Sequence, residues 1–463
     1  MSRRQRIAIV GGGISGLVTA FYLQRRAQER GLDVGLTLLE QSHRLGGVIR
    51  TERESGFLLE AGPEGFASHK PAALSLVEDL GLQDRIVGSN DRLRKTYLYS
   101  HDRLREFPDG MMFLAPVRLG PFWRTAPLSR RGRLRALMEP LVRHSKGDPS
   151  IQDFLSRRLG PEFTDKLAQP MVSAIYGGDA ARLSAPSAMA DFYRLEQRFG
   201  SLYRGMRWLN SLRKNRPDRS CYLSFVDGMQ TLVDELVGRL DRADIRLGLR
   251  DLRLTSWNGR LTIQSADGYH ENFDSLVLTT PAYAGASILR PVLPEALPPL
   301  REIPYSSSRL VYLAYRWTEF AHPQDGFGFI VHPDQEAAVD ACTWVNRKFD
   351  GRCPSDAVLM RVAVHERRQR NLPQADEELA QAVHQDLSRI MGYNCQPIFQ
   401  RVYNVRRGMP QLTVGHARRL EQLRQSLSAV PGLHVCGAFT GGVGIPECIR
   451  SAKETALGVR LQS

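Results

Sequence analysis

The sequence predicts an α/β protein, in which helices and strands alternate along most of the 463 residues. Two observations support this fold class. An apolar run near the N-terminus passes through closely spaced glycines into a helical pattern, and the same succession of strand, glycine turn and helix returns near residues 222 and 432. A third observation divides the chain, because residues 85–216 show few strand patterns and are dominated by helical periodicity, proline and arginine. The length suggests about three domains.

The first element is a buried strand, Ile7–Val10, which leads into the glycine turn Gly11–Gly16 with the sequence GGGISG. The first glycine allows a tight bend, the third leaves room for a pyrophosphate beside the backbone, and the last lets the next helix pack closely on the strand. That helix starts near Ile14 and offers free N–H groups and its positive dipole end to phosphates. The following apolar run ends at Glu40, whose carboxylate suits ribose hydroxyls and disfavours a 2′-phosphate. A dinucleotide site is therefore predicted.

A second motif follows Glu40. Arg44-Leu-Gly-Gly47 completes the run Glu-x-x-x-Arg-x-Gly-Gly, which is not a feature of simple NAD dehydrogenases. The alternative interpretation is an ordinary exit from a strand into a loop with an exposed arginine. Residues 56–63 are typical of a short strand that enters a Gly-Pro turn, which could bring backbone beside a ring system. A helix is predicted over residues 71–82, with Gly81 as its stop.

The segment 111–138 mixes bulky apolar side chains, including Trp123, with arginines such as Arg118 and Arg133. Such a mixture suits a membrane interface, where aromatic rings enter the acyl boundary and arginine meets the head groups. Core helices or the wall of a substrate channel explain the same pattern equally well. The sequence leaves both interpretations open.

The second half of the chain returns to the style of the first element. Strands are predicted at residues 222–225, 245–254, 261–263 and 275–280, and a second sheet at residues 309–315 and 358–364. Residues 376–391 form a predicted helix. A last buried strand, 432–437, precedes a helix whose N-terminus lies near Ile445. The two ends of the chain are therefore expected to share one domain.

Composition narrows the functional classes. The six cysteines are scattered without CxxC pairs, which argues against a zinc site and a disulfide framework and favours a reducing cytoplasm. No apolar stretch is long enough to span a membrane, and the glycines at the N-terminus argue against a signal peptide. The net charge of +14 comes without a basic tail or a nucleic-acid motif, so nucleic acid is not an expected partner. It fits attraction to anionic lipid or a polycarboxylate substrate, and equally a soluble protein from an arginine-rich proteome.

Several further motifs lie far apart in the chain. They are Gly56-Phe-x-x-Glu60-x-Gly62-Pro63, QPMVSAIYGGD at 169–179, the run 224–232, Met-Pro-Gln-x-x-Val-Gly-His at 409–416 and GGVGIPECI at 441–449. Together with the N-terminal motifs they resemble the FAD-dependent porphyrinogen oxidases of haem synthesis, which convert protoporphyrinogen IX or coproporphyrinogen III to the porphyrin and belong to the amine-oxidase-like flavoproteins. The resemblance runs nearly from end to end. Its Ile-Tyr-Gly-Gly-Asp element is more specific than any FAD motif.

The resemblance implies a three-part architecture: a discontinuous Rossmann-like FAD-binding domain, a substrate domain with a mixed β-sheet, and an α-helical domain that meets the membrane or lines the substrate channel. The FAD-binding domain takes residues 1–70, 217–285 and 428–463, the substrate domain 71–84 and 286–427, and the helical domain 85–216. The implied FAD contacts are Gly11, Gly12, Gly13, Ile14, Ser15, Gly16, Glu40, Gln41, Arg44, Gly46, Gly47, Gly62, Pro63, Glu64, Leu252, Val443, Gly444, Ile445 and Pro446.

The resemblance also implies that the substrate lies above the flavin, in contact with Lys70, Thr96, Ala174, Tyr176 and Phe329. Three positions depart from the family pattern. Family members commonly have glycine at Ala174 and often have tryptophan at Val405, and protoporphyrinogen-type members usually have arginine at Thr96. Thr96 and Lys70 resemble the coproporphyrinogen-type enzymes instead.

The implied reaction removes six electrons and six hydrogens from the porphyrinogen in three two-electron steps. A flavin suits these steps, because it accepts a hydride and returns the electrons to oxygen as peroxide. No catalytic side chain and no metal is expected, and the protein positions a flat macrocycle and its propionates, for which Lys70, Arg94 and Lys95 are candidate cations. Coproporphyrinogen III is slightly favoured over protoporphyrinogen IX.

Other interpretations stay open at this point. They are a related flavin amine oxidase or desaturase, a non-catalytic porphyrin-binding flavoprotein, and a flavin-linked scaffold at a membrane surface. The expected partners are the porphyrinogen and O2. An anionic membrane surface, the next enzyme of the haem pathway and a second copy of the chain are left open, and the expected location is the cytoplasm, with peripheral contact to the inner face of the cell membrane also open.

Overall fold

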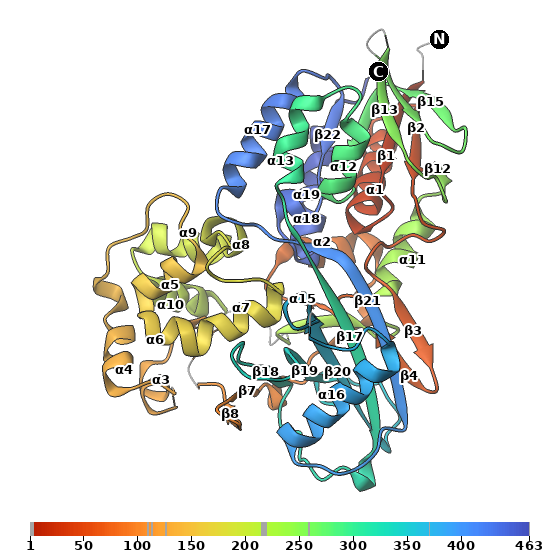
Figure 1. Cartoon of the computed structure of the whole chain (residues 1–463). Helices are drawn as coiled ribbons and strands as arrows, with labels where there is room; N and C mark the ends of the chain where they lie inside the picture. Colours follow the sequence, from red (N-terminus) through yellow and green to blue (C-terminus); the bar gives the residue numbers. More distant parts are fainter. Residues whose placement is uncertain are drawn as a thin grey trace.

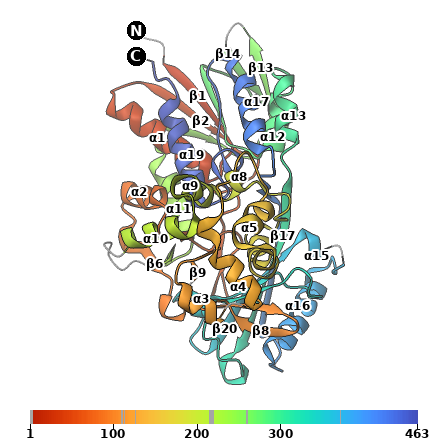
Figure 2. The same cartoon turned by 90° about the vertical axis from the view of Figure 1, so that its left-hand side faces the viewer.

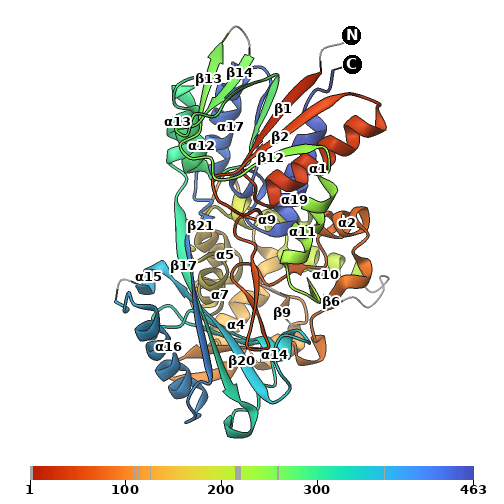
Figure 3. The same cartoon turned by 90° about the vertical axis from the view of Figure 1, so that its right-hand side faces the viewer.

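The computed structural model describes residues 4–108, 111–112, 114–125, 127–213, 220–257, 260–369 and 371–462. Figure 1 shows a parallel sheet with its helices at the top of the view, a larger mixed sheet at the bottom and a group of helices at the left. Two long strands, β17 (Tyr305–Arg316) and β21 (Phe399–Pro410), run from the upper part into the lower one (Figures 1 and 3). The predicted α/β fold class is confirmed.

The parallel sheet has the strand order β12–β2–β1–β16–β22, and all its pairs are parallel. Its strands are β1 (Gln5–Val10), β2 (Val34–Leu39), β12 (Ala243–Arg246), β16 (Ser275–Leu278) and β22 (Leu433–Val435). The central strand is buried on both faces, with Ile7 and Ile9 in one core and Ala8 and Val10 in another. The carboxyl ends of these strands meet at one edge, where open α/β sheets bind their ligands.

Two layers cover this sheet. The first contains α1 (Ile14–Glu29), α2 (Pro71–Leu80), α11 (Gln230–Arg239) and α19 (Ile445–Gly458). The second contains the antiparallel strands β13 (Arg253–Trp257), β14 (Arg260–Gln264) and β15 (His270–Phe273), with α12 (Ala282–Leu289), α13 (Leu297–Arg301) and α17 (His416–Ser428). Helices α1 and α19 lie side by side (Figure 3), so helices from the two ends of the chain share one layer.

The two ends of the chain share one domain, as the sequence predicted. The side chain of Gln5 donates to the Arg460 carbonyl at 2.9 Å and accepts from the Gln462 backbone N–H at 3.0 Å. The predicted helix over 71–82 ends at residue 80, with Gly81 in the left-handed region at φ +73°. The strand predicted over 245–254 is wrong in its extent: it is two strands, because the chain leaves the sheet between them at Gly248, where φ is +77°.

The lower sheet has seven strands in the order β21–β17–β20–β19–β18–β7–β8, and only β18–β7 is a parallel pair. The strands not yet given are β7 (Thr96–Ser100), β8 (Arg103–Glu106), β18 (Gly328–Val331), β19 (Ala341–Trp344) and β20 (Ala357–His365). Helix α16 (Asp376–Met391), which is the predicted helix, packs Leu379 and Val383 against Val311 and Leu313 of β17. Strands β7 and β8 belong to this sheet by pairing, although the sequence placed residues 96–106 with the helical part.

The other face of the lower sheet meets the rest of the chain. Near β17 it is covered by the hairpin β3 (Thr51–Glu54) and β4 (Phe57–Glu60), and near β18 by the helices. Shorter elements connect these parts: β5 (Phe66–Ala67), β6 (Ile86–Gly88) and β11 (Tyr222–Phe225) form a small sheet, and α14 (Val345–Lys348), α15 (Glu366–Gln369) and α18 (Ala438–Gly441) are short helices.

The helical part faces the viewer in Figure 2. It consists of α3 (Leu119–Thr125), α4 (Arg130–Leu137), α5 (Ile151–Leu159), α6 (Pro161–Phe163), α7 (Gln169–Tyr176), α8 (Ala185–Ala188), α9 (Ala190–Phe199), α10 (Leu202–Arg213) and the strands β9 (Met111–Met112) and β10 (Ala115–Pro116). A π-helical stretch, Thr164–Ala168, joins α6 directly to α7. Such stretches often mark functional regions.

A buried ionic cluster fixes α5, α9 and α10 to one another. Arg158 is 0% exposed and lies 2.8 Å from Glu196 and 3.0 Å from Glu139. Glu139 also accepts hydrogen bonds from the Ser201 hydroxyl and the Leu202 N–H at the start of α10. Each carboxylate is therefore paired and hydrogen-bonded, as buried charges require.

No helix in the described part of the chain combines the length and the apolar character that crossing a bilayer requires. The segment predicted to meet a membrane or line a channel includes α3 and α4. Leu134 in α4 is 55% exposed, and Leu141, three residues after the end of the segment, is 77% exposed. The helical domain is thus present, whereas its membrane role is not supported by any span and stays a prediction.

Candidate active site

Both N-terminal motifs meet at the carboxyl edge of the parallel sheet. The Gly11 N–H donates to the Leu39 carbonyl at 2.8 Å, which ties the glycine turn to the end of β2. The Gly46 N–H donates to the Gly12 carbonyl at 2.8 Å, and Gly13 forms an isolated β-bridge with Gly46. The loop that contains Arg44 to Gly47 is therefore hydrogen-bonded to the glycine turn. This contact is expected if both segments belong to one phosphate-binding site.

The start of α1 fits a pyrophosphate. Its N-cap, Gly13, is extended at φ −74° and ψ 179°, and no side chain caps the helix. A Cβ built on Gly13 would meet only the Cα of Gly47, at 3.9 Å, so the approach to the free N–H groups is open. A Cβ on Gly16 would lie far inside contact with the Gly11 carbonyl, which explains why helix and turn can approach so closely.

A second uncapped helix start lies beside the first. Helix α19 has Gly444 as its N-cap without a side-chain hydrogen bond, and its Pro446 stands in the first turn, where no N–H partner is needed. Cys448 in that turn is hydrogen-bonded to Ser15 in the first turn of α1. Helices α1 and α19 thus pack side by side, and each has an uncapped N-terminus that can favour negative charge.

Glu40 lies where the ribose contact was predicted. Its carboxylate accepts hydrogen bonds from the N–H groups of Gly12 at 2.6 Å and Ser42 at 2.8 Å. Its backbone carbonyl accepts from Leu249 N–H at 3.1 Å, so the segment that leads to Leu252 runs beside it. Gln41 and Arg44 are exposed at the same edge, and Arg44 donates to backbone carbonyls, including that of Ile49 at 3.0 Å.

The predicted Gly62-Pro63-Glu64 turn rests on buried charges. The Arg361 side chain donates to the Gly62 carbonyl at 2.7 Å, and Lys348 forms an ion pair with Glu64. Burial opposes ionisation of Glu64, but Lys348 and Arg361 outweigh it and hold its pKa below the usual range. Sequence reasoning missed Arg361 and Lys348. The only available signal for Arg361 was a charge in the middle of the apolar strand VLMRVAV.

The end of α7 holds Tyr176 and Ala174 in place. The Tyr176 hydroxyl donates to the Ala188 carbonyl at 2.8 Å, and its own carbonyl accepts from the Gln411 side chain at 2.9 Å. Gly177 follows in the left-handed region at φ +57°, where a Cβ would meet the His365 ring at 2.7 Å. Burial, with the nearby charges of Glu447 and Asp191, raises the pKa of Tyr176 to about 12.

Lys70 is not a free cation. Its Nζ lies 2.5 Å from Asp191 Oδ2 on α9 and 2.6 Å from Glu447 Oε1 in the first turn of α19. Burial favours the neutral amine, but the hydrogen bonds to Asp191 and Glu447 outweigh it and raise the pKa of Lys70. A substrate carboxylate would have to compete with two carboxylates already in place.

The remaining predicted cations differ in their surroundings. Lys95 lies 3.1 Å from Asp325 and 3.6 Å from Glu106. Arg94 is exposed and has no ion-pair partner among the residues that the structure describes. Thr96 starts β7, and strand alternation puts it on the same face as Leu98, which packs against the helical part.

The prediction that Phe329 lines the substrate site is not supported. Phe329 is 1% exposed and lies in the core beneath α16, together with Val331. Its neighbour Ile330 points to the opposite face and packs with the helical part. Successive side chains of a strand face opposite sides of the sheet, so Phe329 faces away from α7.

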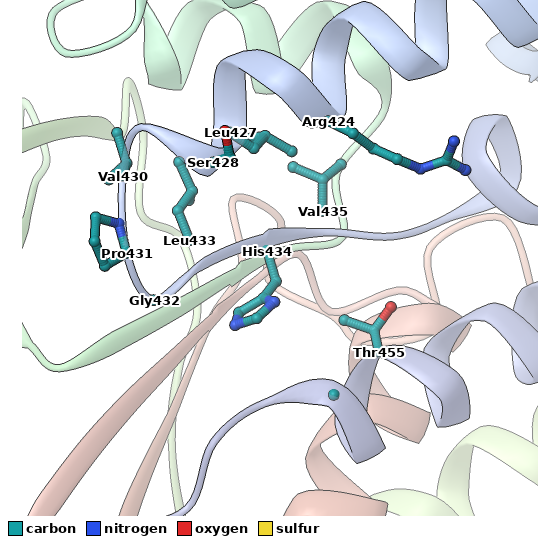
Figure 4. A pocket seen from close by; sticks show the side chains of 11 residues that line it. Arg424, Leu427, Ser428, Val430, Pro431, Gly432, Leu433, His434, Val435 and Thr455 are labelled. Atoms are coloured by element: carbon teal, nitrogen blue, oxygen red, sulfur yellow. The ribbon is translucent and has the colours of Figure 1, made fainter.

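Two surface hollows do not coincide with the helix starts. One of about 410 Å³ lies between α17, β22 and the end of α19, with His434 and Thr455 on its walls (Figure 4). Thr455 stands ten residues after Ile445, roughly 15 Å along the helix at 1.5 Å per residue, which excludes this hollow as the phosphate site. The second hollow has a volume of about 560 Å³ and lies between the segment 44–52 and β21. Gly47 and Val405 are among the residues on its border.

One group of described residues has the composition of a metal site. Ligand atoms of Asp165, His332 and Asp334 lie within 4.8 Å of one another. Both ring nitrogens of His332 are already engaged, one with the Asp165 carbonyl and one with the Asp334 N–H, each at 3.2 Å. The group connects the π-helical stretch to the end of β18.

The sequence model of one family, described as flavin containing amine oxidoreductase, matches residues 14–459. The chain belongs to this family. It is therefore a flavoprotein oxidoreductase with FAD as its cofactor, and the glycine turn with open space at Gly13 fits that cofactor. The resemblance inferred from the motifs is confirmed.

Relatives and solved structures match over nearly the whole chain. The chain is 32% identical to the coproporphyrinogen III oxidase of Bacillus subtilis over 97% of both proteins. It is 29% identical to protoporphyrinogen oxidase 1, chloroplastic, of Arabidopsis thaliana, over 97% of this chain and 87% of that one. A crystal structure from Exiguobacterium sp., provisionally assigned as a protoporphyrinogen oxidase, matches with a TM-score of 0.85 and 30% identity over 98% of both chains. UDP-galactopyranose mutase, at 15% identity and a TM-score of 0.71, shares the fold alone.

Proposed function

We propose that this flavoprotein oxidises a porphyrinogen to the porphyrin, and that coproporphyrinogen III is favoured over protoporphyrinogen IX. The observation that carries the proposal is the place of the Ile-Tyr-Gly-Gly-Asp element. Tyr176 ends α7 and lies within range of the charge of Glu447, which belongs to the uncapped first turn of α19. The near-complete matches to relatives named for the two porphyrinogens support the same reaction class.

The cofactor contacts follow from the same edge of the sheet. We place the FAD pyrophosphate at the start of α1, the ribose at Glu40, and the ring beside the Gly62-Pro63-Glu64 turn and the start of α19. A flavin held by these residues would supply two-electron oxidation of the porphyrinogen, with O2 as the acceptor of the electrons. Three such rounds remove six electrons and six hydrogens from one porphyrinogen and convert three O2 to three H2O2.

The side chains of this chain position the substrate. Ala174 and Tyr176 present the end of α7 to the site, and hydrogen bonds from His365 and Gln411 to their carbonyls keep that end in one orientation. The phenol of Tyr176 keeps its proton at neutral pH because its pKa is raised by burial to about 12. It therefore acts as a hydrogen-bond donor and an apolar wall, and not as a base.

The charges favour the substrate with more carboxylates. Coproporphyrinogen III carries four propionates and protoporphyrinogen IX carries two. Arg94 precedes β7 and has no ion-pair partner among the described residues, whereas Lys70 and Lys95 are already paired. We assign Arg94 the first contact with a propionate, because a guanidinium binds carboxylates through charge-assisted hydrogen bonds.

The decisive experiment supplies the purified holoenzyme with each porphyrinogen under air. Porphyrin fluorescence should appear together with oxygen uptake, and kcat/KM should be higher with coproporphyrinogen III. Fluorescence that rises no faster than autoxidation with both substrates would refute the proposal. Turnover of amines, or porphyrin binding without flavin reduction under anaerobic conditions, would favour an amine oxidase or a non-catalytic porphyrin carrier instead.

A variant tests the contact with the propionates. Arg94→Ala should raise KM for coproporphyrinogen III about tenfold, the loss of one charge-assisted contact, and raise KM for protoporphyrinogen IX less. The matched control is Arg92→Ala, an exposed arginine in the same short helical turn, which should change neither KM. Equal effects of the two variants would remove Arg94 from the site.

A further inference from the structure

Lys70 joins three segments that are distant in the sequence. It is the N-cap of α2, and its ammonium is held between Asp191 of the helical part and Glu447 of α19. The side chains are partly buried, with Lys70 at 28% and Glu447 at 22% exposure. Solvent screens such a pair only in part, so its charges act on groups nearby.

Glu447 covers the loop that leads into α19. A Cβ on Gly442 would meet the Cγ of Glu447 at 2.9 Å, and a Cβ on Gly444 would lie inside contact with its carboxylate. The two glycines therefore make room for this carboxylate. Its neighbour Cys448 is hydrogen-bonded to Ser15 in the first turn of α1. The Glu447 charge thus lies in the uncapped first turn of α19, the helix that packs beside α1.

We propose that Lys70 and Glu447 are a positioning pair that sets the reduction potential of the bound FAD. Two-electron reduction brings negative charge into a flavin site, and a carboxylate nearby opposes it while a cation favours it. The charge of Glu447 alone would cancel part of the stabilisation that the helix starts give to the reduced flavin. The charge of Lys70 offsets that of Glu447 and restores this stabilisation. The proposal rests on the placement of FAD proposed above and is independent of the substrate.

The test is a reductive titration of the holoenzyme against a reference dye. Lys70→Met should shift the ratio of reduced to oxidised flavin about tenfold towards oxidised, which is about 30 mV lower for a two-electron couple. Glu447→Gln should shift the ratio in the opposite direction. The double variant, Lys70→Met with Glu447→Gln, should return to within about threefold of the parent protein, since it removes one charge of each sign.

Lys453→Met is the matched control. Lys453 lies on α19, the helix of Glu447, about two turns after that residue. It also faces a carboxylate, because its Nζ lies 3.7 Å from Asp79. Its removal should leave the ratio within about twofold of the parent. A purely structural role for Lys70 would lower FAD content without this pattern of opposite and cancelling shifts.

Two results would overturn the pair. One is an unchanged reduction potential in Lys70→Met at full FAD content. The other is a reduction potential of the double variant that is as low as that of Lys70→Met. Should Lys70→Met fail to retain FAD, the nearly isosteric Glu447→Gln decides alone, and a potential that does not rise refutes the proposal. The titration contains no porphyrinogen, so failure of the proposed substrate gives a separate result.

Discussion

Gly13→Ala should separate folding from cofactor binding. The residue is extended, at φ −74° and ψ 179°, which any residue adopts, and the nearest atom to a new Cβ is 3.9 Å away. Replacing glycine by alanine at a compatible position restricts the unfolded chain, worth about 0.4–1 kcal/mol, but alanine is a poorer N-cap than glycine by a similar amount, so the stability of the apoprotein should change by less than about 1 kcal/mol. The added methyl group lies in the open space where the pyrophosphate approaches the N–H groups of α1.

The cost to binding can be worked out from the same geometry. A phosphate pushed away from the helix start loses at least one hydrogen bond to a charged group, worth about 1.5–3 kcal/mol. At about 1.4 kcal/mol per factor of ten, the Kd for FAD should rise about 10- to 150-fold. Flavin fluorescence quenching on titration of apoprotein measures the Kd, and urea unfolding of the same apoprotein measures stability.

Gly16→Ala provides the contrast. Its Cβ would lie inside contact with the Gly11 carbonyl and 2.8 Å from the Thr279 hydroxyl, so backbone must move and the apoprotein should lose about 1–3 kcal/mol. If Gly13→Ala binds FAD as tightly as the parent chain, the turn does not hold the pyrophosphate. A loss of more than about 1 kcal/mol of apoprotein stability in Gly13→Ala would show that the space beside this residue is not open.

Three further perturbations follow from the buried charges. Arg158→Met should destabilise the helical part by about 3–5 kcal/mol, because it leaves the buried Glu139 without its ion pair and leaves Glu196 with Arg157 as its remaining partner. Arg157→Met removes a 36% exposed partner and leaves Arg158 on both carboxylates, so it should cost about 1 kcal/mol or less; hydrogen exchange of α5 and α9 compares the two variants, and equal losses would contradict the assignment. Arg361→Met should lower FAD content, measured as the ratio of flavin to protein absorbance, because the Gly62 carbonyl loses its donor; full content would contradict this. The pKa of Tyr176 is about 12 in the folded protein against about 10 in the unfolded chain, so its contribution to stability is complete below pH 10 and is lost as the pH rises towards 12. Between about pH 9.5 and 11.5 the urea midpoint of Tyr176→Phe should therefore fall less than that of the parent protein. Parallel curves for the two proteins would refute the pKa shift.

The cofactor edge could be predicted because its signals are local. The glycine spacing of the first turn, the acid that ends β2 and the glycines before α19 each follow from what backbone and phosphate demand at that point. One hydrogen bond, from the Gly46 N–H to the Gly12 carbonyl, then joins two motifs that the sequence shows only as neighbours along the chain. No long-range information was needed for this part of the site.

The substrate side depends on long-range packing, which the sequence does not show. Residues 328–331 read Gly-Phe-Ile-Val without polar alternation, so nothing in the strand shows which side chains face α7, and the predicted Phe329 lies on the opposite face. Lys70 was predicted as a candidate cation, and its two carboxylate partners could not be foreseen because they come from two distant helices. Strands β7 and β8 were grouped with the helices because their partner β18 lies more than two hundred residues later.

The discontinuous parallel sheet has a consequence for biosynthesis. Strand β22 is the last strand of the chain, and α19, which brings the second helix start to the cofactor, follows it. The sheet therefore cannot close before synthesis has passed β22, and the N-terminal glycine turn meets its partner only after α19 has been made. FAD capture then reports that β22 and α19 have been made, and a chain in which FAD is absent lacks the contribution of bound cofactor to stability.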